Sequence, residues 1–119
     1  MEALEYATNE NPETGSEELF RFAQYNLNAK VPRLKWESAK VIGNIAHRYA
    51  EDLESVITSL IENTKDNGTV VRWSAAYALT QIYILPNYSN DDFRDKLVDI
   101  CQAEEKASIK KIYLKVLKK

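Results

Sequence analysis

The chain has almost none of the cysteine and histidine from which disulfide frameworks and metal centres are built, and it has no long apolar run. Its 119 residues include one cysteine, Cys101, and one histidine, His47, so no pair of these side chains has the spacing of metal ligands. A lone thiol is typical of proteins in a reducing compartment. No apolar run approaches the roughly 20 residues that a membrane span requires. We therefore expect a cytoplasmic protein with no membrane contact, no metal and no cofactor.

Basic residues are absent from one end of the chain, and acidic residues are absent from the other. Residues 1–20 hold six glutamates and no lysine or arginine, which excludes the basic and then apolar plan of a signal peptide. Residues 106–119 hold six lysines and no acid, although the net charge of the chain is only −2. So small a net charge predicts no strong attraction to nucleic acid or anionic lipid. The simplest interpretation of the two runs is an acidic lead-in and a basic last helix, both solvated.

Glycine and proline are scarce as well, with three residues each, and all of them except Gly43 fall between segments of helical apolar period. Residues 8–16 have the composition of a loop, and Ser16 followed by two glutamates has the pattern of a helix N-cap. Pro32 is placed to open a helix, and Pro86 cannot continue one. Asn90, followed by two aspartates, predicts another N-cap. Because no segment alternates with the period of two that strands show, we expect an all-α fold of six helices. They lie at 17–27 and 32–50, from 53 to the turn at 65–68, from that turn to the one at 85–90, from 91 onward, and at 108–119.

The second helix of each expected pair repeats a short pattern. An offset of 37 residues places Trp36 on Trp73 and pairs LKWESAKVIGNI (34–45) with VRWSAAYALTQI (71–82). An offset of 38 then carries Arg72 onto Lys110. Self-similarity at such a period is typical of solenoids, in which each helix pair buries its apolar face against its neighbours. We expect an acidic lead-in over residues 1–15, with or without a short helix, and a repeat domain over 16–119 with units 16–50, 51–86 and 90–119.

The central unit resembles the HEAT repeats of the armadillo-like superhelices. Its segment LESVITSLIENTKDNGTVVRWSAAYALTQI has that family's apolar helix, an acid in the turn at Asp66, a Val-Arg pair at Val71 and Arg72, and then small residues and a leucine. The period of 37 to 38 residues is shorter than the ~40–47 of HEAT and armadillo units and longer than the ~34 of tetratricopeptide units. The resemblance implies a right-handed superhelix of three antiparallel helix pairs, whose second helices line a concave face.

A basic residue stands near the start of each second helix, at Lys35, Arg72 and Lys110. In the HEAT family the equivalent arginine is thought to pair with the acid of the turn and to link adjacent repeats. The resemblance therefore implies a structural ladder in which Arg72 and Asp66 are partners, with Lys35 and Lys110 at the matching positions.

A second set of residues lies off the apolar stripe of the second helices. At 100° per residue, aromatic and basic side chains gather on one side of each of these helices. The set comprises Trp36, Lys40, Trp73, Tyr77, Lys111 and Lys115. Exposed aromatic side chains anchor protein interfaces and cations select acidic partners, so this strip is our candidate partner-binding site. The alternative is that the two tryptophans pack between neighbouring second helices and bridge one repeat to the next.

Catalytic chemistry finds little support in this sequence. His47 has no evident serine or cysteine partner, Cys101 falls on an apolar stripe, and the glycines form no phosphate-binding loop. We therefore expect a protein without enzymatic activity, a scaffold or adaptor that docks an acidic or mixed protein segment on its concave face. One alternative is nucleic-acid binding, because helical-repeat alkylpurine DNA glycosylases also use HEAT-like units. Another is an accessory subunit of a HEAT-like lyase, such as a bilin lyase.

Overall fold

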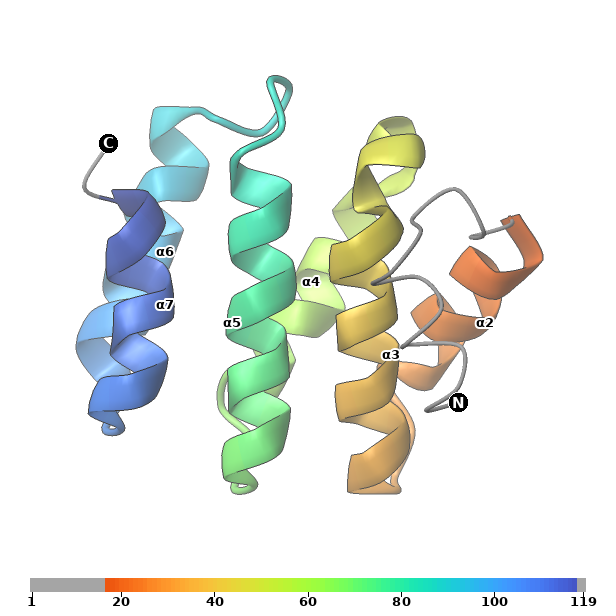
Figure 1. The fold of residues 1–119 in the computed structure, drawn as a ribbon, viewed down its shortest axis with the longest axis horizontal. Coiled ribbons are helices and arrows are strands. Elements are labelled where there is room, and N and C mark those ends of the chain that lie inside the picture. The colour runs from red at the N-terminus through yellow and green to blue at the C-terminus, as the bar shows by residue number, and fades with distance from the viewer. Residues whose placement is uncertain (1–16, 118–119) are drawn as a thin grey trace.

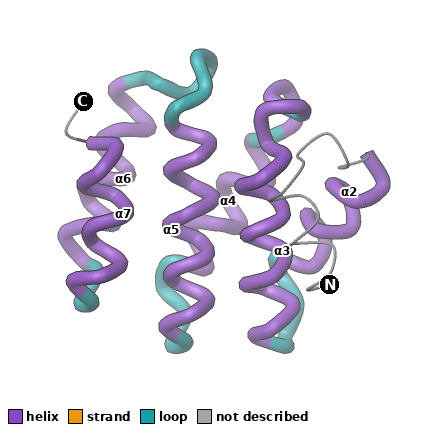
Figure 2. Tube along the Cα trace, viewed as in Figure 1, coloured by secondary structure: helices purple, strands orange, loops and turns teal. Residues whose placement is uncertain are grey.

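Helices and short connections make up the part of the chain that the structure describes (Figure 2). The structure is a computed structural model and describes residues 17–117, so the predicted lead-in and its Ser16 cap lie outside the described residues. The α-helices are α2 (Glu17–Asn26), α3 (Pro32–Ile45), α4 (Glu54–Asn63), α5 (Thr69–Tyr83), α6 (Asp91–Ala103) and α7 (Ala107–Leu117). Two 3₁₀ segments, η2 (Ala46–Arg48) and η3 (Ala50–Asp52), follow α3. Since these residues contain no strand, the prediction of an all-α fold is confirmed for them.

The six α-helices form three neighbouring pairs. α2 packs against α3, α4 against α5, and α6 against α7. α5 also packs against α3 on one side and α7 on the other, so these three helices stand side by side (Figure 1). α2, α4 and α6 begin at Glu17, Glu54 and Asp91, which are 37 residues apart. The arrangement is compatible with the helical repeat that the sequence predicts.

Two of the predicted helix starts are confirmed by the backbone and its hydrogen bonds. Pro32 is the first residue of α3, where its missing N–H removes no helical hydrogen bond. At the start of α6, the Asn90 Oδ1 accepts a hydrogen bond from the Phe93 N–H at 2.9 Å. Asp91 and Asp92 follow in the first turn, beside the positive end of the helix dipole. Local sequence signals are therefore sufficient to begin both helices.

α3 is shorter than the sequence predicts. The pattern predicts a helix over residues 32–50, whereas α3 ends at Ile45 and the chain continues through the 3₁₀ segments. Contacts with distant segments hold this region. The Tyr49 ring stacks on Phe20 of α2 with centroids 4.6 Å apart, and the Tyr88 hydroxyl donates to the backbone carbonyl just after Tyr49 at 2.7 Å. Residues 46–53 contain no glycine or proline, so the early end of the helix coincides with tertiary contacts and not with a local helix breaker.

Apolar side chains from all six helices meet in one core. Its fully buried members include one large side chain from each helix: Phe20, Ile42, Leu60, Leu79, Leu97 and Ile109. The central helix α5 buries Ala75, Ala76 and Ala78, and these small side chains allow neighbouring helices to approach closely. Among the described residues, no helix combines the length and the apolar content needed to cross a membrane.

Candidate functional site

The six predicted partner-binding residues lie on the layer that α3, α5 and α7 form. They are Trp36 and Lys40 on α3, Trp73 and Tyr77 on α5, and Lys111 and Lys115 on α7. Trp73 is 37 % exposed and the two α7 lysines are exposed, whereas the other three side chains are half-buried. The surface that carries these residues, which we call the α3–α5–α7 face, therefore presents an indole and several cations to solvent.

Three of the six residues are in direct contact. The Lys40 Nζ lies 5.6 Å from the centroid of the Trp73 ring, within the range of a cation–π interaction. The Trp73 ring in turn stacks on Tyr77, with centroids 6.0 Å apart and planes 9° from parallel. Because Lys40 is on α3 and Trp73 is on α5, the first contact joins neighbouring helix pairs, whereas the second lies within α5. Trp73 thus packs between helix pairs on one side and is open to solvent on the other.

Tyr77 is positioned by two residues of α3 that sequence reasoning missed. Its hydroxyl donates a hydrogen bond to the Asn44 Oδ1. Its ring lies over Gly43, where a Cβ atom would come within 2.6 Å of the Tyr77 Cε2 atom. Glycine at this position makes room for the ring. The available signal was a glycine inside an otherwise regular helical pattern, which often marks a close approach.

Two ion pairs connect consecutive helix pairs near the starts of α5 and α7. The Lys35 Nζ lies 3.0 Å from the Asp66 Oδ2, and the Arg72 Nε lies 3.1 Å from the Glu104 Oε1. In both pairs, a base near the start of one helix reaches an acid in the turn before the corresponding helix of the next pair. The Glu104 side chain is only 3 % exposed and the other three are at most 23 % exposed. Solvent therefore screens these pairs less than it screens surface ion pairs.

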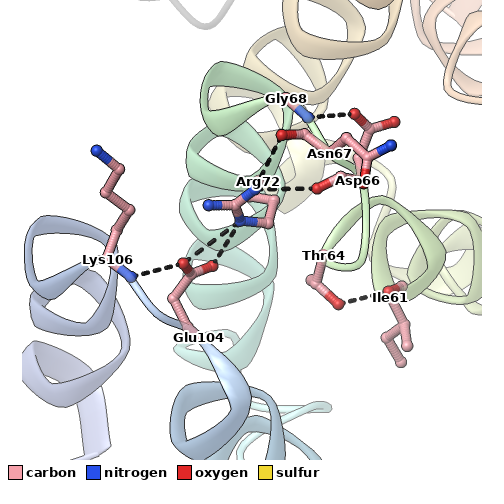
Figure 3. Close-up of polar contacts among 8 residues, drawn as sticks. All are labelled: Ile61, Thr64, Asp66, Asn67, Gly68, Arg72, Glu104 and Lys106. Atoms are coloured by element: carbon pink, nitrogen blue, oxygen red, sulfur yellow. Dashed lines mark hydrogen bonds and ion pairs between the residues drawn. The ribbon is translucent and has the colours of Figure 1, made fainter.

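Arg72 binds a different carboxylate from the one that the HEAT resemblance implies. Its guanidinium donates to two backbone carbonyls of the turn, those of Asp66 at 3.1 Å and Asn67 at 3.2 Å (Figure 3). Its carboxylate partner is Glu104, which accepts from the Arg72 Nε with both oxygens. The Asp66 carboxylate is instead bound by Lys35. Glu104 follows Asp66 by 38 residues, and this repeat offset was the signal that could have found it.

Lys110 holds the third basic position, near the start of α7. It is half-buried, and its backbone carbonyl lies 3.8 Å from the Cys101 Sγ. Within residues 17–117, no acidic side chain forms an ion pair with it. Substitution of Lys110 therefore measures the effect on stability of removing a base at this repeat position that forms no such ion pair.

Two titratable side chains near these ion pairs have shifted pKa values. A hydrogen bond from the Gly68 N–H lowers the pKa of the Asp66 carboxyl, and Lys35 lowers it further against the opposing effect of burial. Burial raises the pKa of the Tyr113 phenol, and the charge of Glu104 adds to this effect. Asp66 therefore stays charged at a lower pH than a free aspartate does, and Tyr113 stays neutral at physiological pH.

Asp66→Asn should make the stability of the protein less sensitive to a fall in pH below 7. A carboxyl whose pKa is lowered by folding stabilises the protein above its unfolded pKa of about 4, and this contribution is lost as the pH falls through the folded value. Thermal unfolding from pH 7 down to about 2.5 should therefore show a smaller loss of stability in the variant than in the wild type. The control is Asp95→Asn at an exposed position of α6, which should reproduce the wild-type profile. Equal losses in Asp66→Asn and the wild type would contradict this role of Asp66.

Other side chains that carry chemistry lie apart from one another. His47 is exposed in the 3₁₀ segment after α3, and Cys101 is buried on α6, as its place on the apolar stripe predicts. Within the described part of the chain, no three His, Cys, Asp or Glu side chains gather as metal ligands would. Comparisons of the chain with protein-family models, with curated proteins and with solved structures gave no significant match. The function is therefore inferred from the geometry of the molecule itself.

Proposed function

We propose that the protein is a noncatalytic adaptor of HEAT-like architecture that binds a protein segment on its α3–α5–α7 face. The observation that carries the proposal is the exposed indole of Trp73, held between Lys40 and Tyr77. A ring whose orientation is already fixed loses little conformational freedom on binding, and large aromatic side chains of this kind dominate the energetics of many protein interfaces.

The charge of this face favours an acidic or mixed partner segment. α3, α5 and α7 together hold seven lysine or arginine residues and one acid, Glu37, which is buried. Three of the seven form ion pairs with Glu37, Asp66 and Glu104, and the other four, Lys40, Lys110, Lys111 and Lys115, leave an excess of positive charge. Lys111 and Lys115 are exposed on α7, and Lys40 lies beside the indole on α3. Cations around an aromatic anchor speed association with acidic partners and disfavour basic ones.

Support for a HEAT-like solenoid comes from the repeated spacing and from the ion pairs. α3, α5 and α7 begin at Pro32, Thr69 and Ala107, so their starts are 37 and 38 residues apart. The two ion pairs connect each helix pair to the next with a separation of 31 and 32 residues. A stack in which each unit is stabilised chiefly by its neighbours has these properties.

Lys40→Glu combined with Lys111→Glu should reduce partner capture by the tagged protein in its native cell by about tenfold or more, because it reverses one charge beside the indole and one exposed charge on α7. Affinity purification followed by mass spectrometry measures the captured proteins. The matched control is Lys30→Glu combined with Lys106→Glu, which makes the same change of charge at two exposed turn positions. We expect this control to retain the partners.

Two results would count against the proposal. If the Lys40 and Lys111 variant retains every partner, the α3–α5–α7 face is not the binding site. If the wild type retards nucleic acid in a gel at about 50 mM salt and this variant does not, the face binds nucleic acid, since phosphate contacts strengthen steeply as salt falls.

A further inference from the structure

A groove lies between α4 and α6, two helices on the far side of the layer of α3, α5 and α7 in Figure 1. Its larger part encloses about 740 Å³ and is lined by α4, α6, the start of α5 and the adjoining turns. A smaller part of about 370 Å³ shares Ile61 and Lys96 with the larger part, so the two adjoin. Ile61 from α4 and Ile100 from α6 give the larger part an apolar lining. We call this space the α4–α6 groove.

Hydrogen bonds bridge the corresponding space between α2 and α4. They are Gln24 Nε2 to Ser55 Oγ (2.5 Å), Asn28 Nδ2 to Ser59 Oγ (3.2 Å), and Asn63 Nδ2 to the Leu27 carbonyl (3.2 Å). All three connect α2, or the turn after it, to α4. The first two helices of this layer are therefore joined directly by their own side chains.

Thirty-seven residues later, the same positions carry side chains that cannot form these bonds. The asparagine and serine of the second bond are replaced by Lys65 and Lys96, whose like charges repel each other. The glutamine of the first bond and the asparagine of the third are replaced by Ile61 and Ile100. All four replacements line the groove. The sequence therefore explains why side-chain hydrogen bonds connect α2 to α4, whereas a groove separates α4 from α6.

Acidic side chains outnumber basic ones around the groove. Of the described residues that line its two parts, six are acidic and three are basic: Glu54, Asp66, Asp92, Asp99, Glu104 and Glu105 against Lys65, Arg72 and Lys96. Asp66 and Glu104 are already neutralised by the ion pairs with Lys35 and Arg72, the second of which is drawn in Figure 3. The remaining four acids exceed the two remaining lysines, so the groove favours a cationic occupant.

We infer that the α4–α6 groove binds a basic amphipathic segment of another protein. Aliphatic side chains of the segment lie against Ile61 and Ile100, and a lysine or arginine next to them meets Asp99 and Glu105. The inference does not rest on the α3–α5–α7 face, which shares only Arg72 of α5 with the groove lining and has the opposite excess of charge. An acidic segment is disfavoured in the groove because it would meet the excess of carboxylates.

Two fluorescein-labelled probe peptides test this selectivity. Both have a Leu-Ala-Leu centre, which is flanked by two lysines on each side in one peptide and by two glutamates on each side in the other. Fluorescence anisotropy should detect binding of the lysine peptide, and ¹³C-methyl spectra should shift at Ile61 and Ile100. Asp99→Asn combined with Glu105→Gln should weaken this binding by about fivefold or more, because it removes the two carboxylates that meet the basic side chain.

Lys65→Asn combined with Lys96→Ser introduces between α4 and α6 the asparagine and serine that form a hydrogen bond between the turn after α2 and α4. This variant should close the groove. The loss of two positive charges would by itself strengthen binding of a basic peptide. If binding instead becomes about fivefold weaker, the cause is that the groove has closed. Ile100→Trp fills the groove without any change of charge and should weaken binding to a similar degree. The matched control, Lys30→Asn combined with Lys106→Ser, removes the same two charges at exposed positions outside the groove lining and should bind no more weakly than the wild type.

Three outcomes would overturn the inference. The first is equal binding by the wild type, the Lys65 and Lys96 variant and Ile100→Trp. The second is a preference for the glutamate peptide, which would assign the groove to anionic ligands held by the two lysines. The third is binding without methyl shifts at Ile61 and Ile100. None of these outcomes bears on the Lys40 and Lys111 variant, so the proposals for the groove and for the α3–α5–α7 face are tested independently.

Discussion

Arg72→Ala should destabilise the protein by about 3–5 kcal/mol, because it leaves the Glu104 carboxylate buried without its cation. The two backbone carbonyls of the turn before α5 lose their guanidinium donor in the same change. For a domain of this size, a loss of this magnitude lowers Tm by roughly 10–20 °C. Urea denaturation at pH 7 measures the free energy of unfolding, and differential scanning calorimetry measures Tm.

Lys110→Ala is the matched control for this variant. Lys110 has the same place in α7 as Arg72 has in α5, but it forms no ion pair with any of residues 17–117. Its substitution should change stability by less than about 0.5 kcal/mol. Adding Glu104→Gln to Arg72→Ala should recover part of the loss, since a neutral amide is buried at lower cost than a carboxylate. If Arg72→Ala costs less than about 1 kcal/mol, the pair contributes no more than an exposed ion pair does.

Gly43→Leu should cost about 2 kcal/mol or more and displace Tyr77 from its place on α3. A Cβ atom at position 43 would lie 2.6 Å from the Tyr77 ring and 3.2 Å from the Ala78 Cα. The ring can move, but the Ala78 backbone can yield only if α3 and α5 separate. Urea denaturation measures the loss of stability. A red shift of Trp73 fluorescence, measured in a Trp36→Phe background, reports the loss of the stacked ring.

A double-mutant comparison tests whether the Tyr77 ring is the cause. Gly43→Ala should cost more in the wild type than in a Tyr77→Ala background, where the ring no longer occupies the space above residue 43. The comparison uses alanine because it adds only the Cβ atom, and its gain in helix propensity over glycine is the same in both backgrounds and cancels. If Gly43→Leu leaves both stability and Trp73 emission unchanged, glycine is not required for the approach of α3 and α5.

The two proposed sites differ in the partner that each would select. The α3–α5–α7 face has an excess of lysine, with Lys40 beside Trp73. The α4–α6 groove has an excess of carboxylates around its apolar lining. A chain with a net charge of only −2 therefore carries two surfaces of opposite charge, which suits an adaptor that joins an acidic segment to a basic one.

Helix type and several helix boundaries were predictable because their causes are local. The N-cap at Asn90 and the first-turn position of Pro32 depend on residues within one helical turn. The offset of 37 residues predicted which helices correspond, and the starts of α2, α4 and α6 keep this spacing. The same offset leads from Asn28 and Ser59 to Lys65 and Lys96. The binding role of Trp36, Lys40, Trp73, Tyr77, Lys111 and Lys115 stays a prediction.

The sequence by itself therefore determined the helical period, the repeat and the order of charges along the chain. Tertiary structure alone decided which of these residues meet. It brought Arg72 to Glu104, seated Tyr77 over Gly43, and ended α3 early where Tyr49 stacks on Phe20. The physical reason is that propensity, capping and periodicity act over one or two helical turns, whereas these contacts depend on how closely helices approach. That approach is set jointly by the packing of side chains from the whole core.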